Sequence, residues 1–299
     1  IFLLSHLIVW TIVPSISNLN LPLDTIEALA WGSNLSWGFS KHPPVSAFIV
    51  EMVFSFFGNQ DWAYYLLSQI FVVTSFIYVW KFSNFIFENK LFSLCSIFLL
   101  EGVYYYNFTS PEFNVNICQL PFWALVVFYS WKSINYEKIS DLILLGIFMS
   151  IGFLTKYLFI YLILTIKIIF LLHLLKKKNF NIRFLIPGTI FILFLIPHLI
   201  WLYQNDFTSI VYALNRTGID ETNFINHLYN PFIFFVKQVG ILIPVFIMLL
   251  TFIDLKKVNF KNLKKDRYFL LLINILPIIL IFLTSFISGA KIRTMWMTP

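Results

Sequence analysis

The chain has 299 residues, of which 59% are hydrophobic and only 12% are charged, and its formal net charge is +7. Ordinary soluble domains carry roughly 45–50% apolar and about 25% charged residues, so this composition excludes a soluble globular domain. The charged residues gather in short clusters between long apolar runs. Because a helix needs about 20 apolar residues to cross a bilayer, the sequence predicts an all-α polytopic membrane protein.

About nine membrane spans are expected, all in one transmembrane domain over residues 1–299. The chain begins at Ile1 and stops at Pro299 soon after an apolar run, so we expect a fragment truncated at both ends. The predicted spans, in chain order, are 1–16, 62–80, 91–107, 117–131, 141–155, 157–175, 184–203, 231–253 and 268–287.

The basic residues predict how these spans are oriented. Four connections hold fourteen of the 21 Lys and Arg residues, and the Lys/Arg bias places such connections in the cytoplasm. The clusters stay on one side only if 141–175 crosses the membrane twice, with a turn at residues 155–157 that puts Lys156 at the outer face. The excess of positive charge therefore reports orientation, and we expect membrane lipid and no nucleic acid as a partner. The clusters are Lys81 with Lys90; Lys132 with Lys138; Lys176, Lys177, Lys178 and Arg183; and Lys256, Lys257, Lys261, Lys264, Lys265 and Arg267.

The first outward connection, residues 17–61, is too apolar and aromatic for a free loop, and it predicts interfacial helices. Read as a helix, residues 24–37 place Asp24, Glu27 and Trp31 on one face. Asp at an N-cap with Glu at the third helical position is also a capping arrangement. Capping and catalysis therefore both stay open for Asp24.

A second acid lies in the outward connection 109–116. Glu112 has Asn114 and Asn116 close behind it and Asn107 just before it. A short connection between membrane helices needs only to be polar, so a solvated turn is one interpretation. The alternative is a functional carboxylate beside a membrane cavity.

Several cationic or titratable side chains lie on the outward side, where the orientation rule gives no reason for them. Each one alone is also explained as an interfacial anchor whose stem snorkels. Together they suit an anionic headgroup, because Arg offers forked donors to phosphate and Lys a point charge. The group consists of Lys41, His42, Lys156, Arg216, Lys291 and Arg293.

The chain lacks a Walker-type loop, a dinucleotide Gly-rich turn, a His-Glu-x-x-His motif and Cys-rich metal spacing. A soluble sugar-nucleotide donor is therefore not expected.

Taken in order, the outward motifs resemble a known family. They are Asp24-x-x-Glu27, Trp31-Gly32, Trp37-Gly38-Phe39, Lys41-His42-Pro43-Pro44, Tyr105-Tyr106-Asn107-Phe108-Thr109-Ser110-Pro111-Glu112-Phe113-Asn114, Leu154-Thr155-Lys156-Tyr157, Pro197-His198-x-x-Trp201 and Asn205-Asp206-Phe207. This set resembles bacterial polyprenyl-phosphate-dependent glycosyltransferases of the GT-C fold, the relatives of dolichyl-phosphate-mannose protein mannosyltransferases and of the lipid A aminoarabinose transferase. The likeness runs from the first span to about residue 216.

The resemblance implies a GT-C-like bundle in the bacterial plasma membrane. Such an enzyme passes a sugar from a polyprenyl phosphate to a glycolipid, glycan or protein acceptor on the periplasmic side. Family members place an essential Asp in the first outer loop, which Asp24 matches, and a second acid in the next one, which Glu112 matches. Many relatives have adjacent Asp and Glu in the first loop, whereas here two residues separate Asp24 from Glu27.

On this resemblance we expect Asp24 to accept the proton of the acceptor hydroxyl. Glu27 or Glu112 would position the acceptor or hold a divalent cation such as Mg²⁺ or Mn²⁺. Lys156 and Arg216, aided by Lys41 and His42, would neutralise the departing phosphate. Asn114 and Asp206 are further candidates for substrate binding.

Two other functions fit the same residues. A transporter or flippase for a lipid-linked anion would use the same outward cations, although paired repeats and broken helices are not evident in the sequence. A non-catalytic membrane scaffold would leave Asp24 and Glu112 unexplained.

Overall fold

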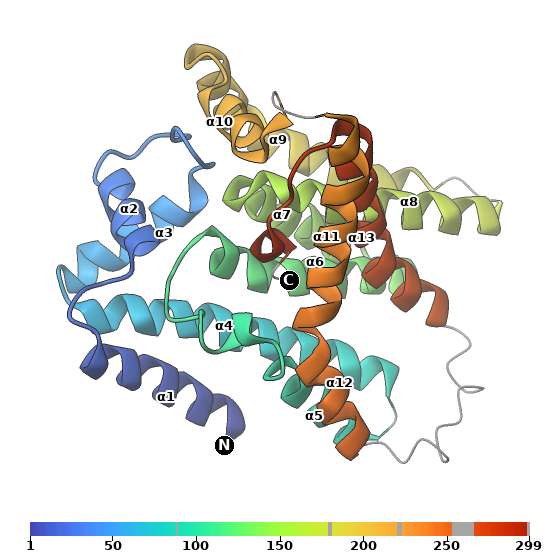
Figure 1. Cartoon of the computed structure of the whole chain (residues 1–299). Coiled ribbons are helices and arrows are strands. Elements are labelled where there is room, and N and C mark those ends of the chain that lie inside the picture. Colours follow the sequence, from blue (N-terminus) through green and yellow to red (C-terminus); the bar gives the residue numbers. More distant parts are fainter. Residues whose placement is uncertain (88, 179–180, 220–222, 253–265, 298–299) are drawn as a thin grey trace.

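The chain is described by a computed structural model over residues 1–87, 89–178, 181–219, 223–252 and 266–297 (Figure 1). In these ranges the secondary structure is helical and no strand is present, which confirms the all-α class. The connection 253–265, with five of the lysines used to orient the chain, lies outside the described residues.

The helices follow one another with short connections. Five of them are long and apolar enough to cross a membrane, namely Asp61–Ile86, Tyr157–Lys177, Ile182–Gln204, Phe224–Thr251 and Arg267–Ser288. The count of nine spans therefore stays a prediction. In chain order the helices are α1 (Phe2–Ser17), α2 (Leu23–Gly32), α3 (Val45–Phe57), α4 (Asp61–Ile86), α5 (Lys90–Leu100), η1 (Tyr104–Tyr106), α6 (Val115–Tyr136), α7 (Ile139–Thr155), η2 (Tyr157–Phe159), α8 (Ile160–Lys177), η3 (Ile182–Leu185), α9 (Ile186–Gln204), α10 (Thr208–Thr217), α11 (Phe224–Ile241), α12 (Ile243–Phe252), α13 (Arg267–Ser288) and η7 (Thr294–Met297).

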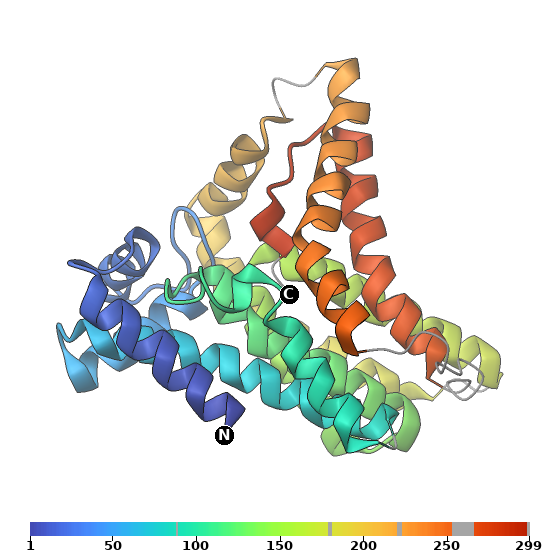
Figure 2. The same ribbon diagram turned by 60° about the horizontal axis from the view of Figure 1, so that its bottom comes forward.

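Two layers of helices share α6 as their common element. On one side α1 lies along α4, and α4 packs against α6 (Figures 1 and 2). On the other side α6 packs against α7, and α7 against α9. Buried apolar side chains fill both contacts, with Phe76 and Phe113 in the first core and Leu142 and Phe159 in the second. This double packing fixes the amino-terminal end of α6 beside the connection of residues 17–61, named the first outer loop after its predicted side of the membrane.

The carboxyl-terminal helices form a pair beside this core. The ribbons of α11 and α13 run side by side in both views, and α13 also contacts α8 (Figures 1 and 2). Beyond α13 the chain turns at Gly289, whose φ of 71° favours glycine. It then returns to the centre of the molecule, where the backbone N–H of Lys291 donates to the carbonyl of Thr217 over 2.9 Å.

Three predicted elements differ from the structure. The helix expected over 24–37 ends at Gly32, and the aromatic stretch behind it is a loop that leads into α3. The span expected over 91–107 ends at Leu100, because Glu101 turns away to bond His6 and residues 104–106 form a separate 3-10 turn. The span expected over 231–253 begins earlier, at Phe224, and is divided at Leu242 into α11 and α12. The turn predicted at residues 155–157 is confirmed, since α7 ends at Thr155 and η2 begins at Tyr157.

Hydrogen bonds tie the first outer loop to the far side of the bundle. His198 Nδ1 lies 2.6 Å from the carbonyl oxygen of Trp37, and its Nε2 lies 2.9 Å from the Tyr157 hydroxyl. A carbonyl only accepts, so Nδ1 of a neutral His198 carries the proton and Nε2 accepts from Tyr157. The Tyr157 oxygen is then free to accept from Ser209, 2.6 Å away. One buried histidine thus connects the loop with η2, α9 and α10.

A close contact of Gly38 reinforces this attachment. A Cβ atom added to Gly38 would lie 2.3 Å from Cε3 of Trp201, far inside van der Waals contact. Only glycine lets the loop backbone approach the indole ring this closely.

We therefore expect Gly38→Ala to destabilise the protein by about 1–3 kcal/mol, the usual cost of overpacking. Thermal unfolding of the purified protein, followed by tryptophan fluorescence, measures the effect. Gly188→Ala in α9 is the matched control, because no atom lies within 4 Å of its added Cβ. Equal melting temperatures for the two variants would contradict the close packing of Gly38.

Candidate functional site

Asp24 and Glu112, which are 88 residues apart in the sequence, meet at the start of α2. The backbone N–H of Asp24 donates to Oε1 of Glu112 over 3.2 Å. One residue on, the hydroxyl of Thr25 donates to the carbonyl of Phe113 over 3.1 Å, in a buried position. The two acidic segments therefore converge in the structure.

The Glu112 carboxylate acts as a cap for α2. The N-cap residue of α2 is Pro22, and no side chain of the helix's own N-terminus makes a capping hydrogen bond. The first N–H groups of a helix have no partner within it, and they favour negative charge. Glu112 supplies both a hydrogen-bond acceptor and that charge from another loop. Asp24 lies inside the first turn, so the interpretation of Asp24 as an N-cap is wrong and its carboxylate is free for other contacts.

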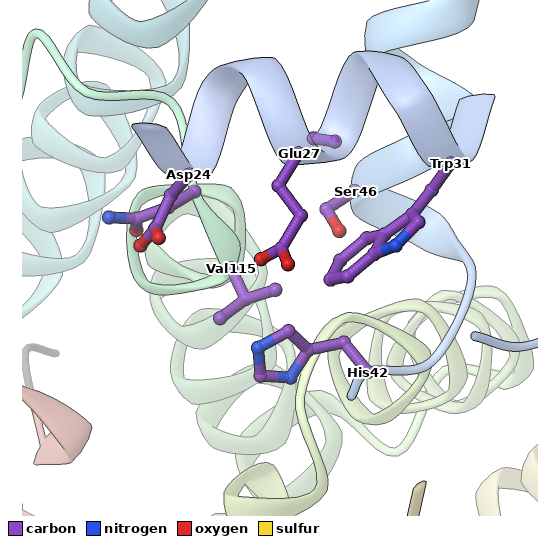
Figure 3. Close-up of a pocket in the computed structure, with 8 residues that line it drawn as sticks. Asp24, Glu27, Trp31, His42, Ser46 and Val115 are labelled. Carbon is purple, nitrogen blue, oxygen red and sulfur yellow. The ribbon is translucent and has the colours of Figure 1, made fainter. Parts of the chain in front are cut away.

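A small cavity opens beside this contact (Figure 3). Glu27 and Trp31 point into it from α2, as predicted for one helix face, and His42 closes it from the loop below. The cavity volume is about 20 Å³, enough for roughly one water molecule, and the cavity is partly open to the outside. The lining residues are Asp24, Glu27, Ala28, Trp31, His42, Ser46, Asn114 and Val115.

The positive charge nearest to the cavity is paired with Glu27. Lys41 Nζ donates to Glu27 Oε1, and the same ammonium group lies 5.9 Å from the centre of the Tyr212 ring in α10. Both charged side chains keep about a third of their surface exposed. Lys41 therefore connects α2 with α10 and stays accessible at the edge of the cavity.

Burial and charge shift the pKa of both acids in the same direction. Burial raises the pKa of Asp24 above its usual range, and the nearby Glu27 raises it further. The cations Lys41 and Arg216 oppose this shift. Burial also raises the pKa of Glu112, helped by the charge of Asp24 and opposed by the hydrogen bonds to that carboxylate. Raised carboxyl pKa values in a partly closed cavity are typical of general bases.

His42 contributes hydrogen bonding and no charge. Burial, with the positive charges of Lys156 and Lys41 nearby, lowers the pKa of His42 to about 3. The ring is therefore neutral at pH 7, and it packs edge-on against Trp31 with 5.9 Å between ring centres. Trp31 in turn stacks on Phe39.

Lys156 is buried behind the cavity, where it does not face an open phosphate site. Its Nζ donates to the side-chain oxygen of Asn116 and to the backbone oxygen of Trp296, the latter over 3.2 Å. Burial lowers the pKa of Lys156 to about 7. Two of its three N–H donors are thus used to bind the carboxyl-terminal segment to α6, and one is left.

The remaining predicted site residues divide between the cavity and its surroundings. Asn114 lines the cavity, but its Oδ1 is used to cap α6 by accepting from the N–H groups of Asn116 and Ile117, over 2.9 and 3.2 Å. Arg216 is exposed on α10 and acts on Asp24 through its charge. Asp206 is exposed in the tight turn before α10, with φ of 50°, and does not line the cavity.

Lys291 and Arg293 are also exposed, in the segment that follows α13.

Ser46 is a cavity residue that sequence reasoning missed. It lies in the first turn of α3 and points between Glu27 and Trp31 (Figure 3). Its hydroxyl is buried and has no hydrogen-bond partner within the described part of the chain. The one sequence signal for Ser46 is its position four residues after His42, directly behind the Lys41-His42-Pro43-Pro44 motif.

The protein side chains alone do not form a complete site for a divalent cation in the described part of the chain. Among the described residues, no group of three or more His, Cys, Asp or Glu side chains is close enough to hold a metal ion. In the cavity, Glu27 is already paired with Lys41.

The chain matches the model of a known protein family. Residues 41–201, more than half of its length, match the family model of the dolichyl-phosphate-mannose-protein mannosyltransferases. The chain belongs to this family. The match includes Lys41, His42, Glu112 and Lys156, whereas Asp24 and Glu27 precede it. The predicted resemblance to GT-C glycosyltransferases is confirmed.

A curated relative is an undecaprenyl phosphate-alpha-4-amino-4-deoxy-L-arabinose arabinosyl transferase from Wigglesworthia glossinidia brevipalpis. It is 31% identical over 134 residues, which make up 42% of this chain and 23% of the relative. The aligned part thus spans about a quarter of that protein. No solved structure matches the chain significantly.

Proposed function

We propose that this chain carries the active site of a membrane glycosyltransferase that moves a sugar from a polyprenyl phosphate to a hydroxyl acceptor. One observation carries the proposal: Asp24 and Glu112 meet at a cavity that has Lys41 at its edge and the charge of Arg216 nearby. Membership of the mannosyltransferase family supports it. The orientation of the basic clusters favours an active site on the outer face of a bacterial plasma membrane.

In the proposed reaction the acceptor oxygen attacks the anomeric carbon of the sugar. The carboxylate of Asp24 takes the proton of the acceptor hydroxyl, and the bond between the anomeric carbon and the phosphate oxygen breaks. The electron pair of that bond leaves with the polyprenyl phosphate. Phosphate is a better leaving group than an alcohol, so a second carboxyl group acting as acid is less necessary than in glycoside hydrolysis. The raised pKa of Asp24 suits a base at neutral pH.

The neighbouring side chains take the other roles. Lys41 and Arg216 stabilise the charge that develops on the phosphate, and Glu27 holds Lys41 in place. His42 and Ser46 offer neutral hydrogen-bonding groups to the sugar hydroxyls.

Lys156 and Asn114 support the site from behind: Lys156 binds Asn116 at the start of α6, and Asn114 caps that helix. Asp206, in the exposed turn before α10, remains a predicted substrate contact.

Replacement of the base tests the proposal. Asp24→Asn should reduce transfer by about 10²–10⁴-fold, because an amide cannot accept the proton. The assay follows the release of polyprenyl phosphate in liposomes that contain polyprenyl-phosphate mannose or polyprenyl-phosphate 4-amino-4-deoxyarabinose, the sugars suggested by the family and the relative. Asp61→Asn is the matched control, since Asp61 occupies the first turn of α4 and lines no part of the cavity.

A folded Asp24→Asn protein that releases polyprenyl phosphate at the parental rate would contradict the proposed base. Movement of intact donor between leaflets, without release of polyprenyl phosphate, would favour the transporter instead.

The dependence of the transfer rate on pH gives a second test. A base must be deprotonated, so the rate should fall as the pH drops through the raised pKa of Asp24. Glu27→Gln removes a like charge and should move this acidic limb to lower pH, whereas Arg216→Gln removes a cation and should move it to higher pH. Measurements of kcat/KM across the acidic range check both directions. Shifts of the same sign in the two variants would contradict Asp24 as the titrating group.

A further inference from the structure

A second and larger hollow lies on the other side of the Asp24–Glu112 contact. It is a groove between α1 and the segment 108–112, with Pro22 at its end, and its volume is about 360 Å³. Glu112 lines this groove, whereas Asp24 lines the smaller cavity. Because the N–H of Asp24 donates to Glu112, the two hollows meet at the pair of acids.

Both walls of the groove change from apolar to polar in the same direction. At one end Trp10 meets Phe108 edge to face, with 5.4 Å between ring centres, and Val13 lies one turn further along α1. At the other end stand Asn18 and the Glu112 carboxylate. The stretch of α1 from Trp10 toward Asn18 covers about 12 Å at 1.5 Å per residue. This length suits a polar head group that is joined to an aliphatic chain.

The apolar end of the groove is open at the outer surface of the helical bundle. Val13 is 52% exposed and Phe108 is 76% exposed. In a chain whose outer surface lies in lipid, exposed apolar side chains of α1 face hydrocarbon. An amphiphile can therefore enter the groove from the membrane without leaving the bilayer.

The two hollows differ in the charge of the residues around them. Among the described residues that line the groove there is no Lys or Arg, and Glu112 is its one ionisable group. Lys41 and Arg216 act on the Asp24 side. A phosphate in the groove would meet a carboxylate and no lining cation, so the anionic donor belongs to the cavity side. A neutral hydroxyl group, in contrast, can donate to Glu112.

We propose that the groove between α1 and residues 108–112 is the acceptor site, and that it takes a neutral sugar hydroxyl carried on an aliphatic chain. The sugar lies at the Asn18 and Glu112 end, where its hydroxyl faces Asp24 across the contact of the two acids. The aliphatic chain lies on Trp10 and Val13. This assignment rests on the proposed transferase function, and it gives the two substrates opposite sides of the same acidic pair.

Photolabelling tests the site without turnover. Octyl β-D-glucoside with a diazirine at the end of its alkyl chain is added to the protein in nanodiscs, and mass spectrometry maps the labelled residues. We expect labels within residues 10–18 and 108–111. Unlabelled octyl glucoside should compete about tenfold better than octyl phosphate, a difference of about 1.4 kcal/mol.

Two variants on the same face of α1 form the matched pair. Val13→Trp fills the groove and should reduce labelling about tenfold, the effect of losing about 1.4 kcal/mol of binding. Val9→Trp adds the same ring one turn away, at a residue that is 49% exposed and does not line the groove, and labelling should persist. In the transfer assay Val13→Trp should raise KM for octyl glucoside as acceptor and leave KM for the donor unchanged.

Labels outside the two walls, equal labelling of both variants or equal competition by octyl phosphate would overturn the acceptor site. Labelling does not depend on catalysis, so its failure in a protein that transfers sugar would disprove the groove alone. Correct labelling of a protein that never releases polyprenyl phosphate would support the groove as an amphiphile site and overturn its assignment as an acceptor site together with the transferase function.

Discussion

The site depends on one long-range interaction, the capping of α2 by Glu112. The start of α2 has unpaired N–H groups and no cap of its own, and the Glu112 carboxylate supplies the missing acceptor from the next outer loop. The buried hydrogen bond from Thr25 to the carbonyl of Phe113 fixes the same junction. Because these contacts join two outer loops, they place the Asp24 carboxylate at the boundary between the cavity and the groove.

The rest of the fold keeps this junction in place. Phe113 and the first turn of α6 are packed into the core that α4 and α6 share, so Glu112 extends from a rigid base. On the opposite side, His198 and Trp201 of α9 hold the loop at Trp37 and Gly38. The first outer loop is thus fastened at both ends, and the cations that it carries stay close to the acids.

The sequence predicts the class of protein and the two acidic connections, and the structure shows that these connections meet. Apolar runs indicate membrane helices from composition alone, and the turn at Lys156 follows from the sidedness of the basic clusters. At the early end of α2, Gly32 lies against Ala47 and Glu51 of α3, and at the break after Leu100, Glu101 binds the His6 side chain. Periodicity does not encode such partners, so these boundaries could not be predicted.

The roles of individual polar residues were harder to predict for the same reason. A carboxylate that caps a helix of another loop has no local signature, so only the structure distinguishes Glu112 as a cap from Asp24 as a free acid. Lys156 was expected at an open outer face, yet its two bonds to Asn116 and Trp296 bury it. Ser46 lines the cavity because α3 folds back against α2, and the sequence pattern does not indicate this contact.

A double-mutant cycle on the two acids tests the central claim most directly. The cycle compares kcat for polyprenyl phosphate release at saturating acceptor in Asp24→Asn, in Glu112→Ala and in the protein with both changes. If Glu112 acts by holding Asp24 in place, the double variant should be no slower than Asp24→Asn alone, since a misplaced amide costs nothing more. Losses that multiply across the two positions would show that the acids act independently, and would contradict the account.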